Sequence, residues 1–380
     1  MLLTFIICLL LTLAYVLLMV VYRRGWSEQK DFAISALHIP HTRISVIIPA
    51  RNEEKNIGAC IDAILAQIYP DYLYEIIVVD DHSEDNTAKI VKEYESKNVR
   101  CISLANYIPM GNKVNSFKKA AIAAGIAQST GALIVTTDAD CIAPNAWLMH
   151  IAAIYEQQNP VMIVAPVIYS SDNSIVQLFQ LTDFMSMQGI TAAAHSLKLG
   201  NMSNGANLAF RKTTFDRIGG YEGIQHLASG DDFLLMMKMN KFSPRSISYL
   251  KSEKATVSTT PQPDWKSFLQ QRIRWASKSG KYNDVKLTGI LLLVYLFNLS
   301  FLVLAVGSLF SSTLLFLGLG MFVTKVLAEY YFIIPVAHFF RKDWVLKYFP
   351  FLQPLHILYI ITAGFLGMLG GYEWKGRRVK

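Results

Sequence analysis

Four long apolar segments constrain this chain more than any other feature of its sequence. Residues 2–22 carry no charged side chain, and the segments 287–310, 314–340 and 351–369 are nearly as apolar. Each is long enough to cross the hydrocarbon layer of a bilayer as a helix. Hydrophobic residues make up 52% of the chain and its mean hydropathy is +0.31, values that favour a membrane protein over a soluble enzyme. The sequence therefore predicts one transmembrane helix over residues 1–24 and about three over residues 286–372.

Basic side chains at the ends of these segments indicate which side of the membrane the rest of the chain occupies. Arg23 and Arg24 follow the first segment at once, and the positive-inside rule places the residues after them in the cytoplasm. The first segment has no basic n-region and no small-residue cleavage site, so a signal peptide is not indicated. We expect an integral protein of a bacterial inner membrane with a cytoplasmic catalytic domain. Four spans would leave the basic tail 373–380 outside, so either one segment is re-entrant or the tail breaks the rule.

Residues 43–260, which follow a polar linker over residues 25–42, have the pattern of a globular α/β domain. We expect strands over residues 44–49, 75–79, 100–104, 132–135 and 161–168, and helices over residues 52–67, 87–96, 116–128, 175–194 and 233–240. This alternation predicts a mostly parallel, Rossmann-like sheet with right-handed crossovers. No G-x-G-x-x-G follows the first strand, so the dinucleotide-binding version of this architecture is unsupported.

The net charge indicates which partners the protein can bind, and the cysteines indicate whether it has a zinc site or disulfides. The formal net charge is +8, which in a membrane protein favours anionic lipid headgroups and phosphorylated substrates. No basic run interleaved with aromatic residues indicates a nucleic-acid groove, so we expect no nucleic-acid partner. The four cysteines are scattered without C-x-x-C spacing, which argues against a zinc site and a disulfide framework.

Two aspartates follow the strand expected at residues 132–135. Asp138 and Asp140 lie just past its carboxyl end, where open α/β sheets bind ligands. One or two carboxylates, together with substrate phosphates, are the usual ligands of Mg²⁺ or Mn²⁺. The sequence therefore predicts a Mg²⁺ or Mn²⁺ site at Asp138 and Asp140, and the alternative is a loop with two solvated aspartates.

Five motifs carry a resemblance to a known family. They are residues 46–54 (VIIPARNEE), 79–83 (VDDHS), 137–140 (TDAD), 230–232 (GDD) and 271–275 (QRIRW). In this order and spacing they resemble the signature of membrane-bound family 2 glycosyltransferases, which include cellulose, chitin and hyaluronan synthases and ceramide glucosyltransferase. The resemblance implies a GT-A nucleotide-diphospho-sugar transferase fold with transmembrane helices. Gly-Asp-Asp stands where the family usually has Glu-Asp.

The resemblance implies which residues bind a nucleotide-sugar donor. The expected nucleotide-binding residues are Pro49, Ala50, Arg51, Glu53, Asp80, Asp81, Lys118 and Asp138. A carboxylate at Asp80 or Asp81 can accept a hydrogen bond from the N3–H of uracil, and Lys118 can neutralise a diphosphate as a point charge. The alternatives are a helix-capping role for the aspartates and a solvated basic helix face for Lys118. Lys113 is a second candidate for this lysine.

The resemblance also implies a general base and an acceptor site. Asp232, beside Asp231, would take the proton of the acceptor hydroxyl, and direct displacement with a single base predicts inversion. Two acids at a helix start could instead serve only the helix dipole. The expected contacts to the acceptor and the diphosphate are Gly205, Asn207, Gln271, Arg274 and Trp275.

An amphipathic helix is predicted over residues 261–285. Gln271, Arg274 and Trp275 share one face of it, at spacing i, i+3, i+4. A separate apolar stripe for the membrane surface comprises Trp265, Phe268, Leu269, Ile273 and Ala276. The alternative is a simple interfacial anchor. Within the membrane segment 314–340, Lys325 and Glu329 are expected to neutralise each other.

Together these features predict an inverting hexosyltransferase of enzyme class 2.4. It would transfer a sugar from a UDP-linked donor to a membrane lipid or lipid-linked acceptor in cell-envelope glycan or glycolipid synthesis. The alternatives are a processive polysaccharide synthase for a cellulose-, chitin-, hyaluronan- or poly-GlcNAc-like product, and a non-catalytic nucleotide-sugar-binding membrane scaffold. Four spans leave little material for a polymer channel, which favours the lipid acceptor.

Overall fold

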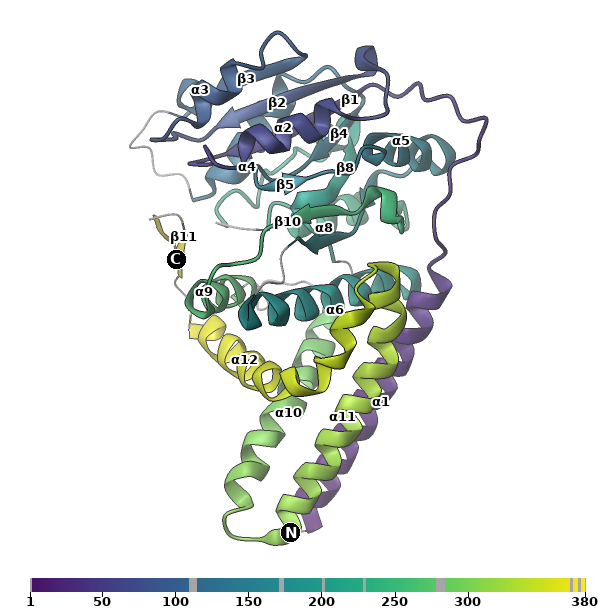
Figure 1. Cartoon of the computed structure of the whole chain (residues 1–380), viewed down its shortest axis with the longest axis vertical. Helices are drawn as coiled ribbons and strands as arrows, with labels where there is room; N and C mark the ends of the chain where they lie inside the picture. The colour runs from purple at the N-terminus through teal and green to yellow at the C-terminus, as the bar shows by residue number, and fades with distance from the viewer. Residues whose placement is uncertain are drawn as a thin grey trace. The chain divides into compact units, whose positions relative to one another are not determined.

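The computed structural model describes residues 2–108, 115–170, 174–199, 202–227, 230–277, 284–369, 372–374 and 377–379. The chain separates into two compact units, whose elements are labelled in Figure 1. The α/β unit is formed by Lys30–Ser170 and Asn201–Thr260, and the helical unit by Met1–Gln29, Ser171–Gly200 and Pro261–Lys380. The segment Ser171–Gly200, expected within the globular domain 43–260, therefore groups with the apolar helices.

The α/β unit is built on a mixed, mostly parallel seven-stranded sheet. Its strands are β1 (Ile44–Ala50), β2 (Tyr74–Asp80), β3 (Val99–Ser103), β4 (Leu133–Thr136), β6 (Met162–Val164), β8 (Leu208–Arg211) and β9 (Ile247–Tyr249). Their spatial order is β3-β2-β1-β4-β8-β6-β9. The first four run parallel, and β8 is antiparallel to both of its neighbours. The mostly parallel sheet expected from the sequence is confirmed.

Continuous β-branched runs explain why the central strands form the core. Val46 of β1 lies opposite Ile76 of β2 and Val135 of β4, and none of the three is exposed. A parallel strand covered on both faces needs apolar side chains at successive positions rather than at every second one. The sheet therefore holds the carboxyl ends of β1, β2 and β4 side by side at one edge.

Six helices of the α/β unit connect these strands. They are α2 (Ile57–Leu65), α3 (Thr87–Lys92), α4 (Phe117–Ala127), α5 (Trp147–Gln158), α7 (Lys212–Arg217) and α8 (Phe233–Phe242). The helix expected to open at Asn52 begins only at Ile57, because Asn52 has a left-handed backbone with φ of 52°. Residues 52–56 are thereby left as a loop at the carboxyl end of β1.

A second, three-stranded sheet lies in the same unit. Its strands are β5 (Cys141–Ile142), β10 (Val257–Thr259) and β7 (Val167–Tyr169), in that spatial order. The single strand expected over residues 161–168 is therefore split between two sheets, β6 in the large one and β7 in the small one. The split falls at Ala165 and Pro166, where proline lacks the N–H that a continuing ladder needs.

The helical unit contains the apolar segments. Its helices are α1 (Leu2–Glu28), α6 (Ile175–Leu197), α9 (Trp265–Ala276), α10 (Val285–Gly307), α11 (Ser312–Phe339) and α12 (Phe349–Leu369), followed by a hairpin of β11 (Tyr372–Trp374) and β12 (Arg377–Val379). By length and composition, α1, α10, α11 and α12 can each cross a membrane. In Figure 1 the helices α1, α10 and α11 run alongside one another, whereas α6 and most of α12 lie crosswise to them. Whether one segment is re-entrant or the basic tail breaks the positive-inside rule stays a prediction.

Aromatic and charged contacts join the helices of this unit. Tyr15 of α1 stacks on Phe297 of α10 with ring centroids 4.2 Å apart. The Nζ of Lys325 lies 2.6 Å from Oε1 of Glu329 within α11, and both side chains are buried. The hydroxyl of Tyr15 donates a hydrogen bond to the same carboxylate. The expected mutual neutralisation of Lys325 and Glu329 is confirmed.

Candidate active site

Acidic and polar side chains gather at the carboxyl edge of the large sheet. Asp80 is the last residue of β2, and Asp138 and Asp140 follow β4. Three buried oxygens at this edge have no hydrogen-bond partner within the described part of the chain: Asp80 Oδ1, Ser116 Oγ and Thr137 Oγ1. Buried polar atoms are nearly always paired in folded proteins. These oxygens therefore indicate a place where a polar ligand completes the structure.

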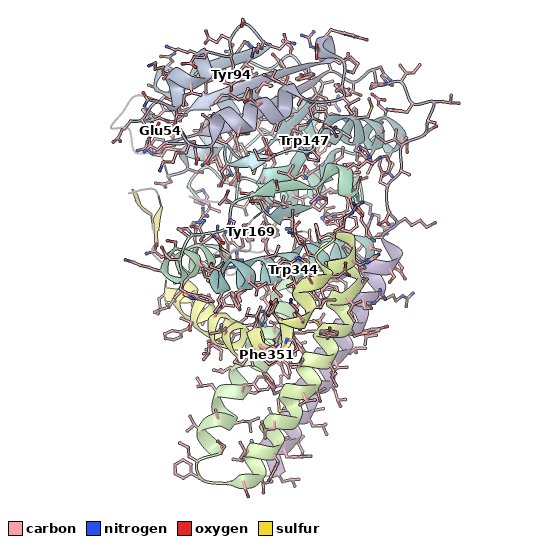
Figure 2. The ribbon with its side chains drawn as sticks, in the orientation of Figure 1. Glu54, Tyr94, Trp147, Tyr169, Trp344 and Phe351 are labelled. Atoms are coloured by element: carbon pink, nitrogen blue, oxygen red, sulfur yellow. The ribbon has the colours of Figure 1, made fainter. Side chains whose placement is uncertain are left out.

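The loops after β1 and β2 are fastened to each other by hydrogen bonds. The amide of Asn52 donates to Ser83 Oγ, and the amide of Glu84 donates to Oδ1 of Asn52. Glu54, labelled in Figure 2, accepts hydrogen bonds from Asn86, and its own amide donates to Asp85. Ser83 thus joins the two loops, and it is Asp85 that accepts from the amide of Thr87 at the start of α3.

Arg51, Asp80 and Asp81 have different roles in this pair of loops. The guanidinium of Arg51 donates to the carbonyl oxygens of Asp81 and His82, at 2.9 and 3.1 Å. Oδ1 of Asp81 lies 3.0 Å from Nδ1 of His82. Asp80 keeps a buried oxygen without a partner in the described residues, as noted above. Of the adjacent aspartates, Asp80 is therefore the better placed to accept a hydrogen bond from a nucleotide base.

Lys118, near the start of α4, lies between acids from distant parts of the chain. Its Nζ is 2.6 Å from Oδ1 of Asp138 and 3.2 Å from Oδ2 of Asp231. Burial lowers the pKa of this ammonium, but the nearby carboxylates outweigh burial and raise its pKa well above the ordinary value. Lys118 therefore stays charged and holds the D-x-D loop beside the Gly-Asp-Asp loop. Lys113, the second candidate, lies outside the described residues.

The pKa of Asp140 is changed by an acid-rich environment. Burial, Asp138 and Glu53 together raise its pKa to about 6. The neighbouring thiols of Cys60 and Cys141 are neutral, because burial raises the pKa of each. Oxygen ligands without thiolates are the donor set of a hard cation.

The residues present fit a cation that is shared with a substrate. Within the described ranges, no three histidine, cysteine or acidic side chains form a metal-binding group. Asp138 and Asp140 could supply one or two carboxylate oxygens, and Mg²⁺ typically completes such a set with water and phosphate oxygens. The donor set thus fits Mg²⁺ or Mn²⁺ bound together with a diphosphate.

The Gly-Asp-Asp segment presents its two carboxylates at the start of α8. Gly230 has φ of +81°, a left-handed conformation that favours glycine. Asp232 Oδ1 accepts from the amide of Phe233 at 2.7 Å, and its Oδ2 accepts from the amide of Gly205 at 3.1 Å. Asp232 is thus the N-cap of α8, and its carboxylate is also oriented by the amide of Gly205.

Gly205 and Asn207 lie in one short loop, but their neighbours differ. A Cβ on Gly205 would lie 3.0 Å from Oδ2 of Asp231 and 3.7 Å from Cβ of Asp232, so Gly205 lines the acid cluster. Asn207 is fully buried; its amide donates to the carbonyls of Pro166 and Ala255 and accepts from Nε1 of Trp147, a residue labelled in Figure 2. We therefore assign Asn207 to the support of the loop rather than to contact with a substrate.

Two further lysines hold the loop that precedes Gly230. Nζ of Lys119, which is 1% exposed, donates to the carbonyls of Ile224 and Leu227 at 2.9 and 2.6 Å. Nζ of Lys238 donates to the carbonyls of Gly220 and Glu222. Sequence reasoning did not identify Lys119, although a lysine next to Lys118 on a short helix must point away from it. Adjacent lysines of α4 thus serve the acids and the loop separately.

The Q-x-x-R-W segment lies on α9, in the helical unit. Gln271, Arg274 and Trp275 are partly buried, and their contribution to the site of the α/β unit stays a prediction. Of the expected apolar stripe, Phe268 is 1% exposed and packs inside the helical unit, whereas Trp265 is 43% exposed; the contact of this stripe with a membrane stays a prediction. The second buried residue of α9 is Arg272. Its burial follows from an ion pair with Asp183 of α6, a partner that the helical periodicity of α9 does not reveal.

The chain matches two models of known protein families. The family model described as glycosyl transferase family 2 matches residues 45–218, and the one described as glycosyl transferase family group 2 matches residues 133–362. Glycosyltransferase AglE from Haloferax volcanii is 29% identical over 189 residues, which are 50% of this chain and 58% of AglE. Human dolichyl-phosphate beta-glucosyltransferase is 35% identical over 122 residues, which are 30% of this chain and 35% of that protein. The chain thus spans less than two thirds of the length of these curated relatives.

A solved structure extends the likeness to nearly the whole chain. The mannosyltransferase PcManGT from Pyrobaculum calidifontis, in complex with GDP-Man and Mn²⁺, superimposes with a TM-score of 0.57 at 17% sequence identity. The match covers 96% of this chain and 99% of that chain. At this identity the likeness concerns the fold.

Proposed function

The chain belongs to glycosyltransferase family 2, and we propose that it transfers a sugar from a nucleotide-sugar donor, of UDP type, to a lipid or lipid-linked acceptor in a membrane. One observation supports this most: Lys118 joins Asp138 of the D-x-D loop to Asp231 of the Gly-Asp-Asp loop. The first loop is suited to a diphosphate and the second to an acceptor hydroxyl. A transferase needs both groups next to the same reacting carbon.

Donor binding is assigned to the carboxyl edge of the sheet. The unpartnered Oδ1 of Asp80 would accept a ring N–H of the base, and Arg51 would hold the two loops in the shape that borders it. The backbone at Pro49 and Ala50 and the side chain of Glu53 complete this border. The N3–H of uracil suits Asp80, but guanine also offers a ring N–H, so the donor base needs a direct test.

The diphosphate is assigned to Asp138, Asp140 and Lys118. Mg²⁺ or Mn²⁺, when bound with the donor at the two aspartates, would act as a Lewis acid that stabilises the leaving diphosphate. Lys118 would turn its ammonium from the carboxylates to the phosphate oxygens as a mobile point charge. Neighbouring acids keep this ammonium protonated, as its raised pKa shows.

Asp232 is assigned the role of general base. The amides of Gly205 and Phe233 fix the direction of its carboxylate. The acceptor oxygen would form a bond to the anomeric carbon while the bond from that carbon to the diphosphate oxygen breaks. The proton of a hydroxyl acceptor passes to Asp232, whereas an ionised phosphate acceptor has no proton to pass on; in either case a single displacement inverts the anomeric centre.

The nature of the acceptor is inferred from the relatives and the apolar helices. Human dolichyl-phosphate beta-glucosyltransferase, by its name, uses a lipid phosphate. Within the described residues, the helical unit has four helices that can span a membrane, which is little material for a polymer channel. A lipid or lipid-linked acceptor is therefore favoured over a growing polysaccharide, and Gln271, Arg274 and Trp275 are the proposed contacts to acceptor and diphosphate.

The decisive experiment uses membranes that contain the full chain. They are incubated with labelled UDP- and GDP-sugars and with Mg²⁺ or Mn²⁺, and the lipid and polymer fractions are then separated. One sugar per lipid supports the proposal, a ladder of products indicates a processive synthase, and donor binding without turnover indicates a non-catalytic scaffold. The variant Asp232→Asn should abolish transfer while donor binding survives. Asp216→Asn, an exposed aspartate on α7, is the matched control and should transfer normally.

We also propose that the protein lies in a bacterial inner membrane with its α/β unit in the cytoplasm. The support is the position of Arg23 and Arg24 at the end of the apolar part of α1. Protease added to sealed, right-side-out vesicles should leave the α/β unit intact and should cut it only after the vesicles are opened. Cleavage in sealed vesicles would contradict this orientation.

A further inference from the structure

The buried face of α9 carries an arginine at its centre. Arg272 is 3% exposed, and its Nη2 donates to Oδ2 of Asp183 in α6 at 2.7 Å. Its Nη1 donates to Oε1 of Gln271 at 3.2 Å. Its Cζ lies 4.2 Å from the ring centroid of Trp275 and 4.8 Å from that of Phe268. One guanidinium thus touches two of the three motif side chains on this helix.

Asp183 is held from a third helix. The hydroxyl of Tyr359 in α12 donates to its Oδ1 at 2.9 Å, and Nε2 of His356 lies 3.8 Å from the same oxygen. Both carboxylate oxygens of Asp183 are therefore engaged, one by Arg272 and one by α12. Asp183 is also the one acidic residue in the sequence of α6.

The network continues from α12 into α11. Nδ1 of His356 lies 3.4 Å from Nζ of Lys325, which also donates to Gln353 and to Glu329. Two cations, Arg272 and Lys325, are thus matched by two carboxylates, Asp183 and Glu329. A cluster that is balanced and paired in this way has no unmatched charge with which to attract an ion.

Stability does not explain why such a pair is kept in the interior. A buried ion pair is costly to desolvate, and apolar residues of similar volume often stabilise a fold as well or better. What the pair adds is geometry, because a guanidinium holds bidentate and stacked contacts in a fixed plane. In α9 the guanidinium carbon lies 4.2 Å from the ring centroid of Trp275, and Nη1 donates to Oε1 of Gln271.

We propose that Arg272, held by Asp183, is a positioning residue that sets the side chains of Gln271 and Trp275 for the incoming acceptor. What those two side chains contact rests on the proposed function; their arrangement by Arg272 does not. Arg272 itself touches no substrate in this scheme. Asp183 acts one step further back, by fixing Arg272 between α6 and α12.

The kinetic test compares two conservative variants of α9, one at Arg272 and one at an exposed lysine. Arg272→Lys keeps the charge and loses the planar contacts, so the KM for the acceptor should rise about tenfold or more, the cost of a lost charge-assisted hydrogen bond. The Kd for UDP should change less than the acceptor KM, since Asp80, Asp138 and Lys118, the proposed contacts to the base and the phosphates, stay intact in the α/β unit. Lys266→Arg, a change at an exposed lysine of the same helix, leaves the Arg272 contacts in place, so its acceptor KM should stay near that of the wild type.

A second measurement needs no sugar transfer. The fluorescence of Trp275 is obtained as the difference between each protein and its Trp275→Phe partner, and its quenching by acrylamide is recorded. Quenching of Trp275 should increase in Arg272→Lys and stay unchanged in Lys266→Arg. If Arg272→Lys does not fold, Asp183→Asn is used, which keeps the shape at residue 183 and removes its charge.

The two measurements separate the possible failures. Unchanged acceptor KM and unchanged Trp275 quenching in both variants would overturn the proposal. A lower Tm with unchanged quenching would also overturn it, because a purely structural pair would behave that way. If the wild type transfers no sugar from any donor, the proposed function fails, and the quenching result alone still decides whether Arg272 positions Trp275.

Discussion

Each unit of this protein contains a cluster of charged side chains, and the two clusters differ in their balance. In the α/β unit, the ammonium of Lys118 interacts with the carboxylates of Asp138, Asp231 and Asp232, and Asp138 in turn faces Asp140. In the helical unit, two carboxylates, Asp183 and Glu329, are matched by two cations, Arg272 and Lys325. The first cluster carries excess negative charge and the second carries none.

This difference separates binding from positioning. Excess carboxylates at the end of a sheet repel one another until a cation joins them, so the α/β cluster is suited to a ligand. A neutral and fully paired cluster stabilises one arrangement of its helices and offers nothing to a ligand. Four predictions test this comparison, from the largest expected effect to the smallest.

Removing an acid from the unbalanced cluster should nearly abolish transfer. Asp138→Asn takes away a proposed cation ligand and the partner of Lys118, so kcat should fall about 1,000-fold. Transfer by the wild type should be lost in EDTA and restored by Mg²⁺ or Mn²⁺. Transfer that continues at the normal rate in EDTA would show that the excess acid serves something other than a cation.

Removing one charge from the balanced cluster should instead unfold the protein. Arg272→Met leaves the carboxylate of Asp183 buried without its cation, which should cost about 3–5 kcal/mol of stability. The double variant Asp183→Leu/Arg272→Met should recover most of that loss in a denaturation experiment in detergent. Arg24→Met, which breaks the exposed pair with Glu28, is the control and should change stability by less than about 1 kcal/mol. A double variant as unstable as the single one would show that the pair is more than charge compensation.

Crowding the acid cluster should slow transfer without removing any charge. In Gly205→Ala the new Cβ would press on Asp231, so the carboxylates should shift and kcat should fall about 10- to 100-fold. Gly289→Ala, in α10, is the matched control, because its Cβ would meet no atom within 4 Å. Equal rates for both variants would mean that the loop of Gly205 adapts freely.

The smallest effect is expected from a substitution at the proposed contact with the nucleotide base. Asp80→Asn replaces a carboxylate, whose Oδ1 has no partner among the described residues, with an amide that can still accept one hydrogen bond, so the Kd for UDP should rise about five- to tenfold. Titration of UDP against membranes with the wild type and with Asp216→Asn provides the reference. An unchanged Kd would show that Asp80 does not bind the base, and would favour a contact between the base and the backbone of Ala50 and Arg51.

Several features of the fold and the site could be predicted from the sequence. The β-branched runs of β1, β2 and β4 led directly to the sheet, and the aspartates that follow two of these strands led to the acid cluster at its edge. Strand boundaries near Pro166 and the late start of α2 were missed, because each depends on the backbone conformation of one or two residues.

The role of individual polar residues was harder to predict. Asn207 was expected to contact the substrate, but both polar atoms of its side chain form hydrogen bonds within the protein, with Pro166, Ala255 and Trp147. An asparagine in a loop looks the same in sequence whether its amide faces a ligand or the interior. Its burial is decided by strands that arrive from elsewhere in the chain.

By itself, the sequence determined the elements and their chemistry, since apolar periodicity and runs of acids are local properties. Only the tertiary structure decided which charges meet. Lys118 forms an ion pair with Asp231, more than a hundred residues away in the sequence, and Arg272 forms one with Asp183, 89 residues away. Because an ion pair depends on distance in space and leaves no pattern along the chain, the balance of each cluster becomes visible only in the folded protein.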